Sequence, residues 1–261
     1  MAATRWSLKT FASALALLVA LMPSSSVSAE TAPPRLDHSA IPTAQSVFLT
    51  LDPGQAAYSG EVRIALEVRE ATGELRFHAR ALTVDLATLK GPAGAVRVTG
   101  IERLDPDQAR VRLAAPLAPG AYTLTLRFHN AYNTEAVALY KSVSGARGYL
   151  FTQFEDTEAR EAFPCWDEPE FKIPWRMTLT VPAADLAISN TPIAHETRAG
   201  LLKTVQFEAS PPMPSYLVAI AVGPFDTVPI QGLSVPGRVV TVRGSSTLAA
   251  EAAAATPAIL R

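Results

Sequence analysis

The chain contains 261 residues, and its 23 Lys and Arg nearly balance its 24 Asp and Glu, so the formal net charge is −1. Hydrophobic residues make up 48%, which is enough for a real core in one large domain or two small ones. The chain has neither the basic stripe typical of nucleic-acid-binding proteins nor a polybasic block for anionic lipids. Composition therefore indicates a globular protein without a nucleic-acid or membrane partner.

The first 29 residues have the pattern of a signal peptide. Arg5 and Lys9 precede an uncharged, mostly apolar run at Phe11–Met22, and Val27-Ser28-Ala29 provides a small-x-small cleavage site. The apolar run has 12 residues, whereas a membrane-spanning helix needs about 20. We therefore expect cleavage near Ala29, a mature chain beginning at Glu30, and export to the periplasm or the medium.

Cys165 is the single cysteine of the chain, so no internal disulfide is possible. We expect its thiol to be a small, buried apolar group, because a nucleophilic role requires an activating histidine nearby in space. Packing and hydrogen bonds must then stabilise the fold.

Alternating apolar and polar residues dominate the middle of the chain. After a polar, proline-bearing leader at 30–42, we expect a β domain at 43–244, in which Val62, Ile64, Leu66 and Val68 share one face of a half-buried strand. Many short strands separated by Gly and Pro turns predict an all-β fold, an antiparallel β saddle or sandwich. The other expected strands are Ser46–Leu51, Glu74–His78, Ala95–Arg103, Gln108–Leu113, Tyr122–Phe128, Met177–Val181, Leu201–Glu208 and Tyr216–Val222.

Two segments depart from the β pattern. Residues 157–163 are expected to form a short helical turn that ends at Pro164. Residues 245–261 are Ala-rich and predict a helix with Ser245 or Ser246 as its N-cap, although Pro257 fits poorly inside it. Because this helix starts just before the chain stops, we expect 245–261 to begin a truncated catalytic domain.

Motifs for metal binding and nucleophilic catalysis are missing from the sequence. His195-Glu196 resembles the start of H-E-x-x-H, but Ala199 stands where the second His belongs. The chain contains neither a G-x-S-x-G elbow nor a phosphate-binding glycine loop. We therefore assign no catalytic and no metal-binding residue. The four histidines, none paired with another at helical spacing, are His38, His78, His129 and His195.

The segment Tyr149–Pro169 mixes aromatic residues, carboxylates, an arginine and prolines more densely than a strand and turn require. Gln153 and Glu155 are two residues apart, so extended backbone places their side chains on the same side. An amide oxygen beside a carboxylate can bind an ammonium group. Asp167 and Glu168 are expected instead to hold a loop by accepting backbone N–H bonds.

This segment closely resembles the T-Q-x-E … A-R … F-P-C-x-D-E-P … F-K signature of the aminopeptidase N family of zinc metallopeptidases. The matching residues are Thr152–Glu155, Ala159-Arg160, Ala162–Pro169 and Phe171-Lys172. Supporting similarity lies at 58–68, 75–82 and 212–225. The resemblance covers the chain from about residue 40 to its end.

The resemblance implies an N-terminal β saddle that packs on a zinc-dependent catalytic domain, in an enzyme that releases N-terminal residues from peptides. It implies that Gln153 and Glu155 line the substrate cleft and hold the free α-ammonium group of the peptide. It also implies a structural role, in the loop and between domains, for Arg160, Pro164, Cys165, Asp167, Glu168 and Pro169. Phe154, Phe163 and Trp166 are most simply core or interface aromatics, and Tyr216 a packed strand residue.

Important parts of the family pattern are not found in this chain. It has no G-x-M-E-N loop, no H-E-x-x-H with its distant Glu, and no later domain with its tyrosine. We therefore expect zinc in the full-length enzyme and none bound by this chain, which is expected to be inactive alone. Two alternatives are a stand-alone exported peptide-binding module that kept Gln153 and Glu155, and a scaffold whose sheet face binds a partner protein.

Overall fold

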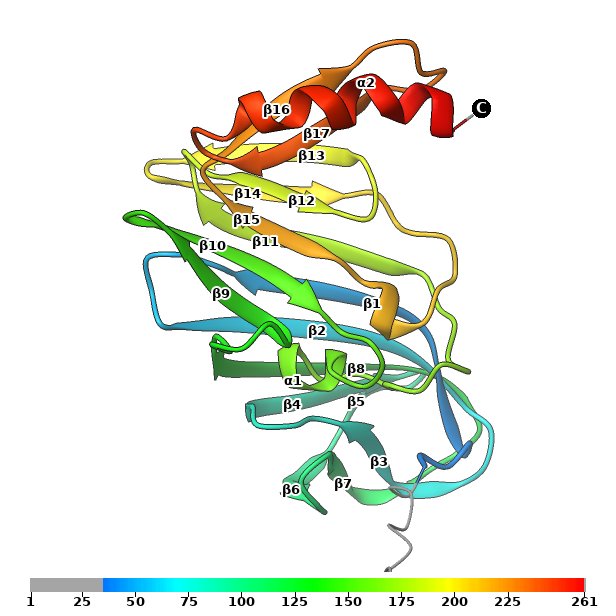
Figure 1. The fold of residues 1–261 in the computed structure, drawn as a ribbon. Helices are drawn as coiled ribbons and strands as arrows, with labels where there is room; N and C mark the ends of the chain where they lie inside the picture. Colours follow the sequence, from blue (N-terminus) through cyan, green and yellow to red (C-terminus); the bar gives the residue numbers. More distant parts are fainter. Residues whose placement is uncertain (1–34, 261) are drawn as a thin grey trace, which may run out of the picture. The chain divides into compact units, whose positions relative to one another are not determined.

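A computed structural model describes residues 35–260, which fold as predicted into an all-β domain with little helix (Figure 1). The expected signal peptide at 1–29 and the first residues of the leader lie outside the described residues. No helix among residues 35–260 is long and apolar enough to cross a membrane.

The largest element is an eight-stranded sheet with the strand order β13-β14-β11-β1-β2-β8-β4-β5. Neighbouring strands are antiparallel except β1 and β11, which run in parallel with Gln45 opposite Trp175. The four apolar residues of the predicted strand at 62–68 lie in β2 and are at most 2% exposed. The strands of this sheet are β1 (Ala40–Thr50), β2 (Ala57–Val68), β4 (Thr83–Gly91), β5 (Gly94–Val96), β8 (Gly120–Ala131), β11 (Trp175–Pro182), β13 (Ile193–Ala199) and β14 (Leu202–Phe207).

Three smaller sheets accompany the large one. The four-stranded sheet has the order β12-β15-β10-β9, the three-stranded sheet has the order β3-β7-β6, and β16 and β17 form a hairpin. Their strands are β3 (Thr72–His78), β6 (Val98–Arg103), β7 (Gln108–Leu117), β9 (Ala138–Ser144), β10 (Arg147–Gln153), β12 (Leu186–Ser189), β15 (Ile220–Gly223), β16 (Phe225–Ile230) and β17 (Gly237–Val242).

The helical elements are short. The expected turn at 157–163 contains α1 (Ala159–Ala162), and the Ala-rich segment contains the 3-10 helix η2 (Ser246–Ala249) followed by α2 (Ala250–Ile259), which contacts the β16–β17 hairpin. Ser245 stands at the cap position of η2, but its side chain makes no capping hydrogen bond. A further 3-10 helix, η1, spans Ser215–Leu217.

A single hydrophobic core connects the inner face of the eight-stranded sheet to the four- and three-stranded sheets. Leu49 of β1, Leu150 of β10 and Val111 of β7 belong to it and are at most 2% exposed. Alternation therefore turns every second residue of the large sheet away from the core, and this outer face carries polar and charged side chains.

Two expected strands were wrong in detail. The segment Ala95–Arg103 is divided between β5, which pairs with β4, and β6, which pairs with β7, because the chain changes sheets here. The segment Tyr216–Val222 starts inside η1 and only becomes β15 at Ile220. β1 begins at Ala40, three residues before the expected start of the domain.

Candidate functional site

The candidate site lies where β10 ends. β10 is an inner strand of the four-stranded sheet, and its last residue is Gln153. The Glu155 backbone N–H donates a hydrogen bond to the Gln153 side-chain oxygen at 3.3 Å, and both side chains are exposed. The structure thus brings the Gln153 amide to the backbone of Glu155 and leaves the Glu155 carboxylate open to solvent. Binding of an ammonium group by this pair stays a prediction.

Phe154 fixes the backbone between the two exposed residues. Its ring is 1% exposed and meets Phe163 edge-on, with ring centroids 5.7 Å apart. Phe163 in turn lies 5.9 Å from Trp175 of β11. Because neighbouring side chains of extended backbone point in opposite directions, burial of Phe154 turns Gln153 and Glu155 outward.

Asp167 is the centre of a buried polar network behind this loop. One carboxylate oxygen accepts hydrogen bonds from the backbone N–H and the Nε of Arg160 at 3.1 and 3.0 Å, and the other accepts the Ser215 hydroxyl. Arg160 also donates to the backbone oxygen of Asp167 at 2.7 Å and to the Asp107 carboxylate at 3.1 Å. The network therefore ties α1 to η1 and to the start of β7, as a charge-assisted cluster with its partners in place.

Cys165 and His78 form the other side of the network. Their backbones exchange hydrogen bonds of 2.8 and 3.1 Å, and the His78 Nδ1 accepts the backbone N–H of Asp167 at 3.1 Å. Burial, followed by the nearby Arg160 charge, lowers the pKa of His78 to about 3, so the ring is neutral. Burial raises the pKa of the Cys165 thiol well above its ordinary value. Cys165 is thus the buried small group that the sequence predicted.

The remaining motif residues hold the loop from several sides. Glu168 accepts the Leu36 backbone N–H at 2.8 Å, so the predicted backbone bonds to Asp167 and Glu168 are confirmed. The Pro164 carbonyl accepts the Gln45 side-chain N–H at 2.9 Å, whereas Pro169 is exposed.

The predicted aromatic residues behave differently from one another. Phe154, Phe163 and Trp166 are core residues, with at most 2% exposure. Tyr216 packs against the core but lies in η1, so its assignment to a strand was wrong.

A metal centre is not formed by these residues. Over residues 35–260, no three side chains of His, Cys, Asp or Glu lie close enough to hold a metal ion. His195 and Glu196 lie on β13, an exposed strand at the edge of the eight-stranded sheet and not a helix. Zinc therefore does not fit the described residues, and we derive no chemical step through it.

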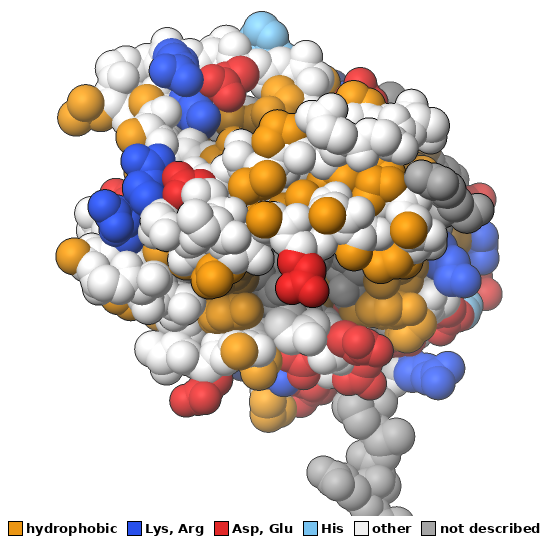
Figure 2. All heavy atoms as spheres, turned by 45° about the horizontal axis from the view of Figure 1, so that its top comes forward, with side chains coloured by type: hydrophobic (Ala, Val, Ile, Leu, Met, Phe, Trp, Pro, Cys, Tyr) orange, Lys and Arg blue, Asp and Glu red, His pale blue; other side chains and the backbone are white. Residues whose placement is uncertain are grey.

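The four-stranded sheet that carries Gln153 also has an open apolar face. Tyr140, Phe151 and Ile188 line a depression of about 270 Å³ there, and the rings of Tyr140 and Phe151 lie 5.8 Å apart. Figure 2 shows one face of the molecule, on which hydrophobic side chains gather around acidic ones. The hairpin β16–β17 covers Tyr149, whose hydroxyl accepts the Arg243 backbone N–H at 3.1 Å, and leaves Phe151 half-buried.

Sequence reasoning missed the partners of Asp167. His78 and Ser215 lie 89 and 48 residues from it along the chain, and Asp107 lies 53 residues from Arg160. No local pattern marks these residues, because their neighbours in sequence are those of ordinary strands and turns. The one available signal was the density of charged residues at 155–168, which needs polar partners if it is buried.

Comparisons with known proteins agree with the fold and the motif described above. Residues 41–217 match the Peptidase M1 N-terminal domain family. The chain is 37% identical to "Aminopeptidase M1-D" of Oryza sativa subsp. japonica, over 80% of this chain and 24% of the relative. It is 35% identical to "Puromycin-sensitive aminopeptidase" of Caenorhabditis elegans, over 80% and 23%, and 28% identical to "Aminopeptidase N" of Acetobacter pasteurianus, over 77% and 58%.

The chain spans about a quarter of the length of the first two relatives. The match covers the eight-stranded sheet, the loop from Gln153 to Pro169 and the Asp167 network up to Ser215. The fold and the motif predicted from the sequence therefore lie within the matched region. The chain belongs to the M1, or aminopeptidase N, family of peptidases and contains its N-terminal domain.

Proposed function

We propose that this chain forms one wall of the substrate cleft of a zinc-dependent aminopeptidase, where Gln153 and Glu155 bind the α-ammonium group of a peptide. The observation that supports the proposal is the contrast within one loop. Gln153 and Glu155 are exposed, whereas the residues around them, Phe154, Arg160 and Asp167, are buried and bonded. An exposed polar pair on a rigid buried frame is the arrangement that a binding site requires.

The chemistry of the pair suits a free N-terminus. The Glu155 carboxylate accepts charge-assisted hydrogen bonds from an ammonium group. The Gln153 oxygen uses one lone pair for the Glu155 N–H and keeps the second for the ligand. A peptide with a blocked N-terminus lacks the positive charge, and binding it leaves the carboxylate without a partner once the cleft excludes water.

The rest of the reaction belongs to parts of the enzyme that these residues do not supply. The zinc of the full-length enzyme belongs to these parts, because residues 35–260 provide no group of side chains that could hold it. The open apolar face around Tyr140 and Phe151 supports docking of a catalytic domain in cis beside Gln153, because exposed apolar patches of this kind mark interaction surfaces. By this proposal the chain alone hydrolyses nothing.

Export is part of the proposal and is supported by residues 1–29 alone. Arg5, Lys9 and the apolar run at Phe11–Met22 are the features that a secretory signal peptide shares. Expression of the whole chain in a bacterial host, followed by mass spectrometry of the periplasmic protein, should show a mature N-terminus at Glu30. Recovery of the uncleaved chain from the cytoplasm alone would contradict it.

The ammonium-binding role is tested in a chimera, in which residues 41–217 replace the matched part of rice Aminopeptidase M1-D. Glu155→Gln should lower kcat/KM for an aminoacyl chromogenic amide by about thirtyfold, because the carboxylate loses its charge beside a desolvated ammonium. Glu70→Gln, a change to another exposed carboxylate, is the matched control and should leave kcat/KM unchanged. Equal kinetics for both variants would refute the role of Glu155.

The isolated chain provides a second test. Purified residues 30–261 should show no turnover of the same amide, with or without added zinc. Zinc-dependent turnover that Glu155→Ala abolishes would overturn the proposal that the chain alone is inactive. Tight binding of unblocked peptides without turnover would instead favour a stand-alone binding module.

A further inference from the structure

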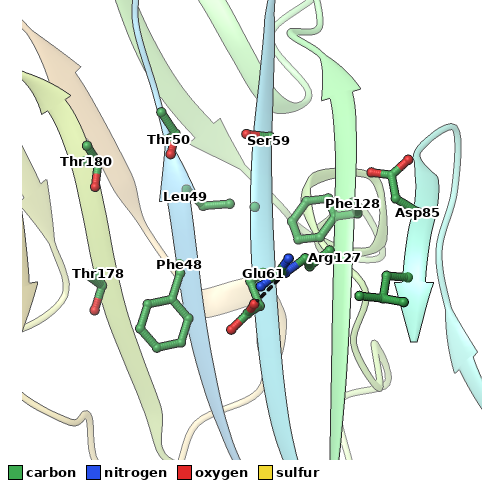
Figure 3. Close-up of a pocket in the computed structure, with 12 residues that line it drawn as sticks. Phe48, Leu49, Thr50, Ser59, Glu61, Asp85, Arg127, Phe128, Thr178 and Thr180 are labelled. Atoms are coloured by element: carbon green, nitrogen blue, oxygen red, sulfur yellow. Dashed lines mark hydrogen bonds and ion pairs between the residues drawn. The ribbon is translucent and has the colours of Figure 1, made fainter. Parts of the chain in front are cut away.

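The outer face of the eight-stranded sheet contains a depression that neither Gln153 nor Glu155 lines. Its volume is about 510 Å³, and it crosses the five neighbouring strands β11, β1, β2, β8 and β4 (Figure 3). Sites for small ligands commonly have volumes of this size. All five strands are inner strands of the sheet, so their backbone N–H and C=O groups are already paired and an extended peptide cannot add to them as a further strand.

Hydroxyl groups and the ring of Phe48 form most of the accessible part of this surface, with the buried Phe128 and Leu49 beneath them. Thr178 and Thr180 of β11, Thr50 of β1 and Ser59 of β2 all line the depression (Figure 3). The ring of Phe48 lies among them, because the register places Phe48 opposite Thr178 on one side and Glu61 on the other. Arg63 lies over this ring, with its Cζ 4.8 Å from the ring centroid. The surface therefore combines hydrogen-bonding oxygens with one aromatic ring, of which a guanidinium group already covers one side.

The charged groups at the depression already have partners. Glu61 accepts hydrogen bonds from Arg63 and Arg127 at 2.8 and 2.9 Å. Partial burial opposes ionisation of Glu61, but the two arginines outweigh it, and the pKa of Glu61 lies below its usual value. Asp85 lies 3.0 Å from the His129 ring. A charged ligand would have to compete with these pairs, which disfavours both anions and cations.

A second depression continues the same face. Its volume is about 440 Å³, and Thr88, Thr123 and Thr125 line it together with Lys90. Thr125 is two residues from Arg127 on β8, so these two neighbouring outward side chains connect the depressions at a spacing of roughly 7 Å. The hydroxyl-rich track is longer than one ring-sized ligand needs.

We propose that this face binds a neutral oligosaccharide, with one sugar ring against Phe48 and its hydroxyl groups bonded to Thr50, Thr178 and Thr180. Sugars present both an apolar C–H face and many hydroxyl groups, which matches an aromatic ring set among threonines. The filled backbone pairs argue against a peptide that adds as a strand, the paired charges of Glu61 and Asp85 argue against an ion at the first depression, and the hydroxyl groups argue against a lipid chain. The site lies on a different sheet from Gln153 and is independent of the proposed aminopeptidase role.

The test is a titration of the full chain, labelled with ¹⁵N, with cellohexaose, chitohexaose and maltohexaose in separate NMR experiments. At least one of them should shift the amide signals of β1 and β11 in a saturable way, with a Kd on the order of 1 mM or tighter. Phe48→Ala should weaken that binding about tenfold, because the stacked ring loses its apolar contact.

Because Phe48 is half-buried, its removal can disturb the fold, and Thr178→Val provides a second variant of nearly the same shape. It removes one hydroxyl group and should weaken binding about fivefold. Thr197→Val on the edge strand β13, which lines neither depression, is the control and should bind like the unchanged chain.

Three results would overturn the proposal. The first is the absence of any saturable shift with all three hexasaccharides up to about ten times the expected Kd. The second is a saturable shift that maps to the end of β10 and not to β1 and β11. The third is equal binding by Thr178→Val and Thr197→Val.

Discussion

The carboxylates of Asp167 and Glu61 bind arginines at nearly equal distances but in opposite surroundings. Asp167 lies 3.0 Å from the Nε of Arg160, and both side chains are at most 4% exposed. Glu61 lies 2.9 Å from the Nε of Arg127, whose side chain is 65% exposed. When one partner of the buried pair is removed, the other keeps a charge that water cannot reach. On the outer face, solvent takes the place of the lost partner. Distance alone therefore does not rank these interactions, and burial decides.

The largest effect is expected at the buried network. Asp167→Ala should lower the free energy of unfolding by about 3–5 kcal/mol, because Arg160, Ser215 and the Arg160 backbone lose their common acceptor. Urea denaturation of the described domain measures this change. Asp85→Ala, on the exposed face, is the matched control and should cost far less. Similar losses for the two variants would contradict the conclusion that burial decides the strength of these ion pairs.

The next effect concerns pH and arises at His78. Its pKa is about 3 in the folded chain and about 6.5 in an unfolded chain. Between these two pH values, His78 binds a proton in the unfolded chain but not in the folded chain. This contribution to stability is complete above about pH 6.5 and falls as the pH drops toward 3, with about 2 kcal/mol lost between pH 7 and pH 5. His78→Gln should flatten this part of the pH profile. An unchanged slope would mean that the pKa of His78 is the same in the folded and the unfolded chain.

A smaller effect is expected at the outer face. Glu61→Gln should change the free energy of unfolding by less than about 1 kcal/mol, because Arg63 and Arg127 remain hydrated without their partner. The difference should shrink further in about 1 M salt, which screens exposed charges. Denaturation at low and high salt measures the loss in the free energy of unfolding under both conditions. A loss above about 1 kcal/mol that does not depend on salt would show that Glu61 behaves like the buried Asp167.

The smallest change in stability is expected at Glu155. Glu155→Ala should leave the free energy of unfolding within about 0.5 kcal/mol, since its carboxylate is exposed. Chemical denaturation of this variant beside Asp167→Ala compares two members of one loop. A marked loss of stability at Glu155 would indicate a structural role and weaken its proposed role in binding.

Much of the fold was predictable, because it depends on local alternation. The strand at Val62–Val68 was recognisable from its pattern of period two, and the buried aromatics at Phe154, Phe163 and Trp166 from their place in a dense motif. The acceptor roles of Asp167 and Glu168 also followed from residue type.

The rest depends on contacts between distant residues, which local pattern does not encode. The parallel pairing of Gln45 with Trp175 joins segments on either side of the motif, and no alternation pattern distinguishes it from an antiparallel pair. Likewise, Ser215 begins a 3-10 helix where a strand was expected, and its hydroxyl is bound to Asp167, which lies 48 residues earlier. At Gln153 and Glu155 the sequence predicted a shared side, but not that the amide would accept the neighbouring N–H.

The parallel seam between β1 and β11 has a consequence for the order in which the chain is made. A ribosome finishes β1 at Thr50 long before it reaches Trp175, so the partly made sheet ends in an unpaired strand during that interval. Such an edge offers free N–H and C=O groups to any other nascent chain. The interval ends when β11 pairs with β1. In the finished sheet β13 is the edge on this side, and the charged side chains of Glu196 and Arg198 there oppose aggregation.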